Sequence, residues 1–237
     1  MSTPTILDVG SKTKLYESSD SSGNRTFDLD VPINANIVVI QVGLDADATT
    51  NNKITGLTHT GLTGAVELFD IDTSADNIRA ARTGIYDVSK CGAGTLEVTA
   101  ALTGSAACVA SVVMTDGFLE SFTTYVDRVM DRGRLNVHTP NNDDNIVVML
   151  GTIQAASSTF AFADTSAGVT SLFKTDHSSA TFSGMAASQA TAVNGMKTIT
   201  YSNAVSGDEF AATAVVFCTQ KDPFNGITGK LTSPVVK

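Results

Sequence analysis

The side chains that could act in acid–base or nucleophilic chemistry are few and far apart in this sequence. Its three histidines, His59, His138 and His177, lie in three different segments, and no Gly-x-Ser-x-Gly turn marks a serine nucleophile. Hydrolysis by a nucleophile requires that the nucleophile and its base lie within hydrogen-bonding distance of each other. No segment supplies such a pair by its spacing, so we expect no catalytic residue and no enzymatic activity.

Two carboxylates facing one another across a bound sugar would be the alternative, since glycoside hydrolysis needs such a pair. The chain has no Trp and only four Tyr, so the aromatic rings on which sugars stack are scarce. Glu97 alternates with Leu96 and Val98, and we therefore interpret it as the outward residue of a strand. The five glutamates of the chain are Glu17, Glu67, Glu97, Glu120 and Glu209.

Acidic clusters give calcium a basis in the sequence. Asp70, Asp72 and Asp76 lie close together, and Asp45 and Asp47 form a second cluster. Hard carboxylate oxygens at such spacing bind Ca²⁺, but the glycine and distal glutamate of the EF-hand loop are missing. We expect no cofactor and no metal site, with calcium as the alternative that these loops leave open.

Composition and charge exclude several kinds of partner. The formal net charge is −9 and the sequence pI is about 4.6, so phosphate neutralisation and attraction to anionic headgroups are both unavailable. We therefore expect no nucleic-acid partner and no membrane partner. No apolar run reaches the length of a transmembrane helix, and no secretory signal follows Met1, so we expect synthesis in a cytoplasm. Three cysteines are too few for a disulfide framework.

An internal repeat is the strongest pattern in the chain. Residues 36–39 and 145–148 are both Asn-Ile-Val-Val, and each copy ends in a second apolar run, at residues 110–115 and 213–218. A Thr-rich alternating segment precedes each closing run. Repetition of this length indicates two tandem copies of one domain.

Short alternating or β-branched segments separated by turn residues fill both copies. Residues 26–31 alternate strictly, with Phe27, Leu29 and Val31 on one face. This pattern predicts an all-β fold made of two tandem jelly-roll-like β-sandwich domains that arose by internal duplication. Residues 123–132 are the one candidate helix, with an extended linker as the equal alternative. The predicted boundaries are an N-terminal arm at 1–25, a first sandwich at 26–117, a linker at 118–144, a second sandwich at 145–219 and a C-terminal arm at 220–237.

The predicted linker contains Arg128, Arg132 and Arg134, which are half of the arginines in the chain. One interpretation is that these charges are simply solvated. The other is that they contact acidic groups of a neighbouring subunit, because arginine is favoured at protein interfaces. We take the three arginines as the candidate interface residues.

The order of strands and turns in the first copy resembles known domains. A strand at 37–42 is followed by segments at 54–58 and 85–88, a turn at 92–94, a Thr-rich strand at 95–99 and an Ala-rich closing strand at 106–115. This order is similar to the small β-sandwich domains of structural proteins on the heads, tails and fibres of tailed bacteriophages. The resemblance covers 26–117 well and 145–219 more loosely, and it implies a non-enzymatic virion component.

The function that we expect is therefore that of a structural subunit of a phage particle, specifically a capsid decoration (cement) protein. Its partners would be the major capsid protein or other virion proteins and further copies of itself, and its location would be the virion. The strand edges at 26–31 and 95–99 and the two arms would be its adhesive surfaces. The alternatives are a tail or fibre component, or an extracellular adhesin module that binds carbohydrate or a receptor through residues 69–77.

Overall fold

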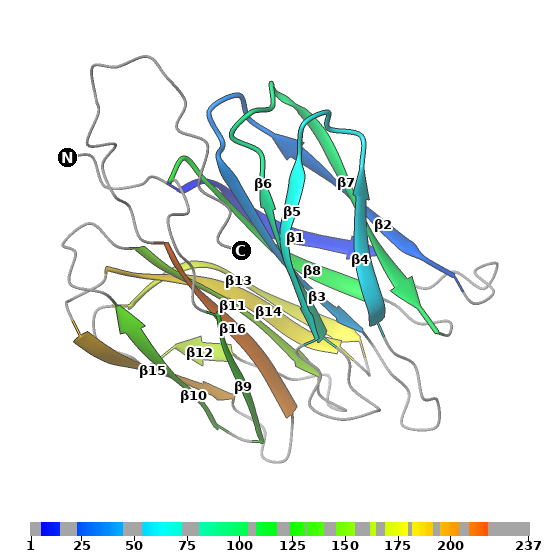
Figure 1. The fold of residues 1–237 in the computed structure, drawn as a ribbon. Helices are drawn as coiled ribbons and strands as arrows, with labels where there is room; N and C mark the ends of the chain where they lie inside the picture. The colour runs from blue at the N-terminus through cyan, green and yellow to red at the C-terminus, as the bar shows by residue number, and fades with distance from the viewer. Residues whose placement is uncertain are drawn as a thin grey trace, which may run out of the picture.

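The computed structural model shows a protein built from antiparallel β-strands (Figure 1). It describes residues 6–14, 23–44, 54–72, 81–103, 108–117, 124–130, 132–139, 146–154, 162–164, 169–179, 182–191, 195–203 and 209–217. Every regular element in these residues is a strand, so the expected all-β character is confirmed for this part of the chain. Within the same residues there is no helix with the length and apolar character needed to cross a bilayer.

The first eight strands form two sheets. Sheet A has the order β1-β8-β3-β6-β5, and sheet B has the order β2-β7-β4. The strands are β1 (Ile6–Lys14), β2 (Arg25–Val31), β3 (Ile37–Leu44), β4 (Ile54–Thr60), β5 (Val66–Asp72), β6 (Ala81–Asp87), β7 (Gly94–Leu102) and β8 (Cys108–Thr115).

The next eight strands form two further sheets. Sheet C has the order β13-β14-β11-β16-β9, and sheet D has the order β10-β15-β12. Figure 1 shows these strands in the lower part of the molecule and β1–β8 in the upper part. The strands are β9 (Thr124–Met130), β10 (Arg132–Thr139), β11 (Ile146–Gln154), β12 (Phe162–Asp164), β13 (Val169–Ser179), β14 (Phe182–Thr191), β15 (Gly195–Asn203) and β16 (Glu209–Phe217).

Strand pairing follows one rule in both sets. In the first set β1 pairs with β8, β2 with β7 and β3 with β6, each time antiparallel. In the second set β9 pairs with β16, β10 with β15 and β11 with β14. If β9 to β16 are counted in the same way as β1 to β8, the strand orders of sheets C and D are those of sheets A and B.

The core of the first set lies between sheets A and B. Phe27 and Leu29 on β2 and Leu96 on β7 have no exposed surface, and they belong to the same buried cluster as Val38 and Ile40 on β3. The two-residue period of each strand brings these side chains to the inner faces. Complete burial of one such side chain contributes about 1.5–3 kcal/mol, so this layer can hold the two sheets together without metal or disulfide.

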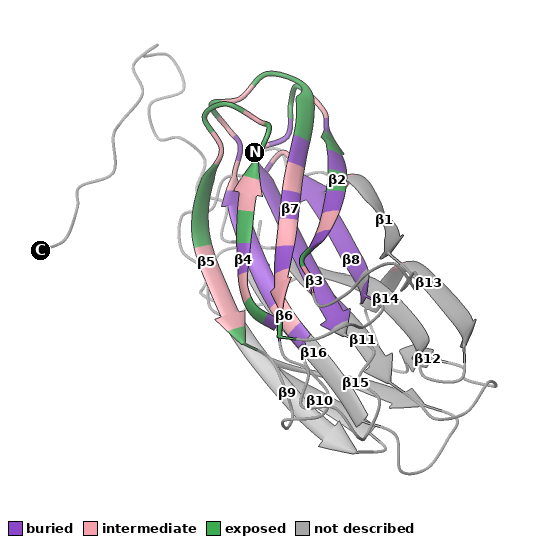
Figure 2. Ribbon diagram, turned by 90° about the vertical axis from the view of Figure 1, so that its right-hand side faces the viewer, coloured by how far each residue is buried: buried purple, intermediate pink, exposed green. Residues whose placement is uncertain are grey.

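Sheet A is also buried on its second face. Ile37, Val39, Ile85 and Val113 are at most 2% exposed but lie outside the core between sheets A and B. On sheet C, β11 contacts β3 and β8, and β14 contacts β8. Figure 2 accordingly shows β3 and β8 in purple. Sheet A is therefore an inner layer, with sheet B on one face and sheet C on the other.

The contacts between terminal strands give the stack two distinct sides. β1 contacts β2 and β13, and β12 contacts β13, so β2, β1, β13 and β12 lie along one side. β5 ends sheet A at the side away from β1, and β9 ends sheet C at the side away from β13. Since β4 contacts β5 and β10 contacts β9, the strands β4, β5, β9 and β10 lie along the other side.

Three expectations from the sequence need correction. The range 1–25, expected to be an arm, contains β1, which pairs with β8 along its length. The range 118–144, expected to be a linker, contains β9 and β10, so the helix considered for 123–132 is wrong. Residues 95–99 are not an edge, because β7 lies between β2 and β4, whereas 26–31 do lie on the edge strand β2. The C-terminal arm at 220–237 lies outside the described residues.

Asn36, the first residue of the repeated Asn-Ile-Val-Val, joins three strands. Its backbone N–H donates to the carbonyl of Thr115 over 2.9 Å, and its own carbonyl accepts the N–H of Val88 over 2.8 Å. Its side-chain amide donates to the carbonyl of Asp116. One residue thus fixes the start of β3 to the ends of β8 and β6, which gives the asparagine of the motif a structural role.

Replacement of Asn36 by Ala should lower the free energy of unfolding by about 1 kcal/mol, because the Asp116 carbonyl loses its side-chain donor. Urea denaturation followed by circular dichroism would measure the change. The matched control is Asn34→Ala, because Asn34 is an exposed turn residue in the same connection. Equal stability of the two variants would show that the Asn36 side chain does not hold β3 to β8.

Candidate functional site

The side of the sandwich formed by β4 and β5 carries four ionisable side chains, His59, Glu67, Asp70 and Asp72. β4 is the last strand of sheet B and β5 is the last strand of sheet A, although the two follow one another in the chain. The turn between them has Gly61 at φ 86° and Gly64 at φ 93°. A Cβ on Gly61 would lie 2.7 Å from the carbonyl oxygen of Thr95, so this close turn from one sheet to the other requires glycine.

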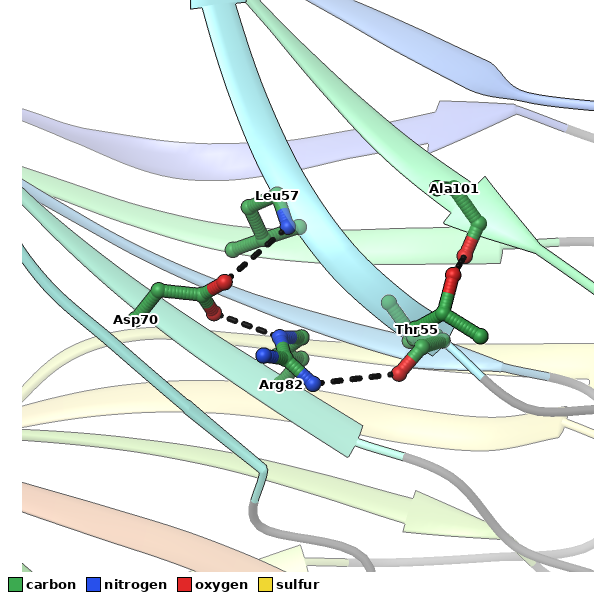
Figure 3. Close-up of polar contacts among 6 residues, drawn as sticks. Thr55, Leu57, Asp70, Arg82 and Ala101 are labelled. Carbon is green, nitrogen blue, oxygen red and sulfur yellow. Dashed lines mark hydrogen bonds and ion pairs between the residues drawn. The ribbon is translucent and has the colours of Figure 1, made fainter.

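Asp70 and Arg82 form a clamp between the two sheets (Figure 3). The carboxylate of Asp70 on β5 accepts the backbone N–H of Leu57 over 3.2 Å and the Nε–H of Arg82 over 2.5 Å. A second nitrogen of Arg82 donates to the carbonyl of Ile54 over 3.3 Å. Leu57 and Ile54 are both on β4, so the clamp occupies backbone groups of an edge strand from the neighbouring sheet.

The position of the clamp restricts what can bind at β4. An edge strand presents unpaired N–H and C=O groups that can recruit another strand. The Asp70 and Arg82 side chains are only 15% and 16% exposed, so their ion pair is held close to the backbone that it covers. Beside the clamp, Thr55 lies at a register shift of β4, and its hydroxyl donates to the carbonyl of Ala101 over 3.2 Å. This part of β4 is therefore protected from strand addition.

β5, by contrast, presents apolar side chains to solvent. Val66 is 51% exposed and Leu68 is 38% exposed, and Glu67 between them is also exposed. The register with β6 shifts between Glu67 and Phe69, so Leu68 is the additional residue of a β-bulge. Figure 2 shows the beginning of β5 in green, on the outer border of the sandwich. Within the described residues, this edge therefore offers adjacent exposed apolar side chains that another protein could contact.

Tyr86 lies behind this edge with its hydroxyl buried. The side chain has no exposed surface, and its hydroxyl has no hydrogen-bond partner. The ring packs edge-on against His59, with the ring centroids 5.1 Å apart. Burial raises the pKa of the Tyr86 phenol well above its ordinary value, and the negative charges of Glu67 and Asp70 raise it further. A phenol of this kind stays protonated and does not serve as a base.

The histidines and glutamates form no catalytic arrangement among the described residues. His59 is on β4, His138 on β10 and His177 on β13, which belong to three different sheets. His59 Nε2 is 3.2 Å from the carbonyl oxygen of Ala65. Glu97 accepts the hydroxyl of Thr60 over 2.8 Å across neighbouring strands, so it supports strand pairing.

The acidic residues considered for calcium divide into two groups. Asp70 and Asp72 are on β5, and both oxygens of Asp70 are already bound by Leu57 and Arg82. Asp45, Asp47 and Asp76 lie outside the described residues. Within the part of the chain that the structure describes, no group of three or more His, Cys, Asp or Glu side chains is arranged to hold a metal ion.

The three candidate interface arginines lie on terminal strands. Arg128 is on β9, the end of sheet C, while Arg132 and Arg134 are on β10, the end of sheet D. These two strands contact one another. Whether the arginines contact a neighbouring subunit stays a prediction, but their strands are placed where a neighbour could reach them.

Sequence analysis did not identify the clamp or the role of Tyr86. The signal was present, because Arg82 is the only charged residue before Asp87 in β6, a strand that is otherwise almost wholly buried. Asp70 likewise interrupts the apolar residues of β5. A lone cation on β6 is expected to pair with a carboxylate of β5, but that strand also carries Glu67 and Asp72, and Asp72 is the residue opposite Arg82 in the register. The choice of Asp70, and its reach to β4, could not be read from the sequence.

Comparison of the chain with protein-family models, with curated proteins and with solved structures gave no match.

Replacement of Asp70 by Ala should lower the free energy of unfolding by about 2 kcal/mol, because it leaves a largely buried guanidinium without its carboxylate. Leu57 N–H would also become available at the edge, so we expect more self-association of the variant. Thermal denaturation and light scattering would measure the two effects. Asp28→Ala is the control, since Asp28 is an exposed residue on the edge strand β2. The clamp would be unimportant if both variants behaved alike.

Replacement of Tyr86 by Phe should leave stability at neutral pH unchanged or raise it by about 1 kcal/mol, because the buried hydroxyl has no partner. The phenol in the unfolded chain ionises near pH 10, whereas the folded state resists ionisation. Stability of the wild type should therefore be full below about pH 10 and fall as the pH rises above this value. The variant should lose less stability over the same range in urea titrations, and an identical decline in both proteins would contradict this account.

Proposed function

We propose that this chain is a non-enzymatic structural subunit of a tailed-phage particle, and that within the particle it acts as a capsid decoration protein. The observation that carries the proposal is what four of the described polar side chains bind. Asn36, Asp70, Arg82 and Glu97 all bind neighbouring strands, while the accessible chemistry of the first set is a strand edge with exposed apolar residues. This arrangement suits a protein that works through its surfaces.

The strand orders support the finer part of the proposal, that the chain is a duplicated jelly roll. The pairing of first with last strand in each set is the pattern expected when an eight-stranded ribbon is rolled into two sheets. The Ile-Val-Val of the repeated motif begins β3 and β11, which hold equivalent places in sheets A and C. Jelly rolls of eight strands occur in viral capsid domains and in lectins.

The phage assignment itself is supported by the resemblance of the strand-and-turn order at 26–117 to domains of tailed-phage virions. We favour the head over the tail or fibre because four stacked sheets form a compact unit that could bridge neighbouring capsomers. Many weak contacts of this kind become strong when a symmetric particle repeats them.

The adhesin alternative has less support from the geometry. It would place ligand contacts at residues 69–77, where the Asp70 carboxylate is already occupied by Leu57 and Arg82. The remaining polar residues of that segment after Asp72 lie outside the described residues.

The test is whether the chain is a component of purified particles of the phage that encodes it. We expect mass spectrometry of gradient-purified particles to find it at a copy number fixed relative to the major capsid protein. Simultaneous replacement of Arg128, Arg132 and Arg134 by Ser should reduce its incorporation at least about fivefold, since charged contacts at an interface are each worth up to about 1 kcal/mol.

Lys90→Ser serves as the control for loss of surface charge, because Lys90 is an exposed turn residue of the first set. The thermal midpoint of each isolated variant would show that folding is intact. Absence of the chain from purified particles would refute the proposed function, and full incorporation of the arginine variant would remove the arginines from it.

A further inference from the structure

Strands β4, β5, β9 and β10 lie along one side of the stack. Charged residues of opposite sign occur on the first two and the last two of these strands. β4 and β5 together carry Glu67, Asp70 and Asp72 and have no lysine or arginine, and Asp70 is paired with Arg82 of β6. β9 and β10 together carry Arg128, Arg132 and Arg134 against the single carboxylate of Asp127. One side of the molecule therefore brings together the carboxylate-bearing strands of the first set, called here the acidic half, and the arginine-bearing strands of the second set, called the basic half.

The acidic half also has an apolar component. Val66 and Leu68 are exposed, and Phe69 and Ile71 are half-buried. On the neighbouring strand β6, Ile85 lies opposite Phe69 and Thr83 lies opposite Ile71. Ile85 and Thr83 are completely buried. Burial thus decreases abruptly at the border of sheet A, and a further strand beside β5 would cover these side chains.

From this arrangement we infer that the side defined by β4, β5, β9 and β10 is a contact between two copies of the chain related by a two-fold axis. Such an axis brings each β5 beside the β9 of its partner, so the acidic and basic halves meet twice in one dimer. The surface is self-complementary, which is the requirement for an isologous interface.

The clamp makes β5 the accessible edge of the acidic half. Asp70 and Arg82 cover Leu57 and Ile54 of β4, so strand addition at this part of sheet B is blocked. Sheet A ends at β5 and sheet C ends at β9, and pairing of β5 with the β9 of the partner would continue one sheet into the other.

The charge of the whole chain favours local complementarity. Two copies that each carry −9 repel one another at a distance, and cations that face carboxylates at the contact offset part of this repulsion. This inference deepens the proposed function, because it names a second copy as the first partner of the assembly subunit.

The experiment is sedimentation velocity of the full chain in low salt. We expect a concentration-dependent species of twice the 24.6 kDa mass of one chain, which weakens as salt is added. Two charge-reversal variants then test the contact. The first is Val66→Lys with Glu67→Lys, at two exposed positions of β5, and the second is Arg132→Glu with Arg134→Glu on β10.

Each variant alone should dimerise at least about tenfold more weakly than the wild type, because like charges then meet at both junctions. An equimolar mixture of the two should recover dimers. In the β5 variant both halves of the contact side carry added or native cations, in the β10 variant both carry carboxylates, and the two variants therefore complement one another. Recovery in the mixture would also show that both variants are folded. Asp28→Lys on β2 is the matched control, because it lies on the opposite side of the stack and should leave dimerisation unchanged.

Three results would overturn the inference: a wild type that is monomeric up to millimolar concentration, dimers that the β5 and β10 variants do not weaken, or a mixture that does not recover them. Growth of the wild type into chains longer than two subunits would replace the two-fold contact with a head-to-tail one. The proposed function fails separately, because it requires the chain in purified particles, whereas dimerisation is measured on the isolated protein.

Discussion

Strand β3 has no face that is open to water, and this double burial determines how the layers around it are arranged. Val38 and Ile40 point into the core shared with sheet B, while Ile37 and Val39 are buried on the other face. A strand that is apolar on both faces must be covered twice. Sheet B covers one face, and the contacts of β3 and β8 with β11 place sheet C over the other. The stacking of the two sets of strands is therefore linked to the composition of a single segment.

Charged side chains make up only 16% of this protein, and several of the described polar side chains complete the backbone hydrogen bonding of strands. Asn36 joins the start of β3 to β8, and the Asp70–Arg82 clamp occupies the free groups of β4. A buried row consisting of Thr83, Gln41 and Ser111 crosses β6, β3 and β8 in register, on the face that sheet C covers. The Ser111 hydroxyl of this row has no hydrogen-bond partner, so the row places an unsatisfied polar group in the layer between sheets A and C.

The all-β character and most strands of the first copy could be predicted from the sequence, because the alternation of Phe27, Leu29 and Val31 and the apolar run at 37–42 reflect local burial. Strand β5 was the exception, because Asp70 and Asp72 suggested an acidic loop. The roles of residues 6–14 and 124–139 could not. Their strands are stabilised by distant partners, with Ile6 opposite Thr115 and Arg132 opposite Ser202, and local sequence contains no record of such pairing. The position of residues 95–99 was missed for the same reason, since their Thr-rich alternation is equally suited to an edge and to the central place that β7 occupies.

The clamp could not be predicted because it depends on the change of sheet between β4 and β5. A hairpin would have paired these strands directly and placed Asp70 beside β4 in the same sheet. The turn at Gly61 and Gly64 instead carries β5 into sheet A, which brings Asp70 across the gap to Leu57. Only the three-dimensional structure relates the glycines of the turn to the carboxylate that they position.

The pairing of first with last strands also affects how the protein is made. Ile6 pairs with Thr115, so sheet A cannot be completed until the ribosome has released the whole first set of strands. At 5–20 residues per second, this interval lasts on the order of 5 to 20 s. Closure of such long loops is also intrinsically slow, because their entropy must be lost before the distant contacts form. During that time the apolar strand β3 is already synthesised but lacks β8, and a second, nearly identical strand order follows on the same chain. Delayed closure and the risk of pairing between the two sets therefore make synthesis the stage at which this protein most needs protection by chaperones.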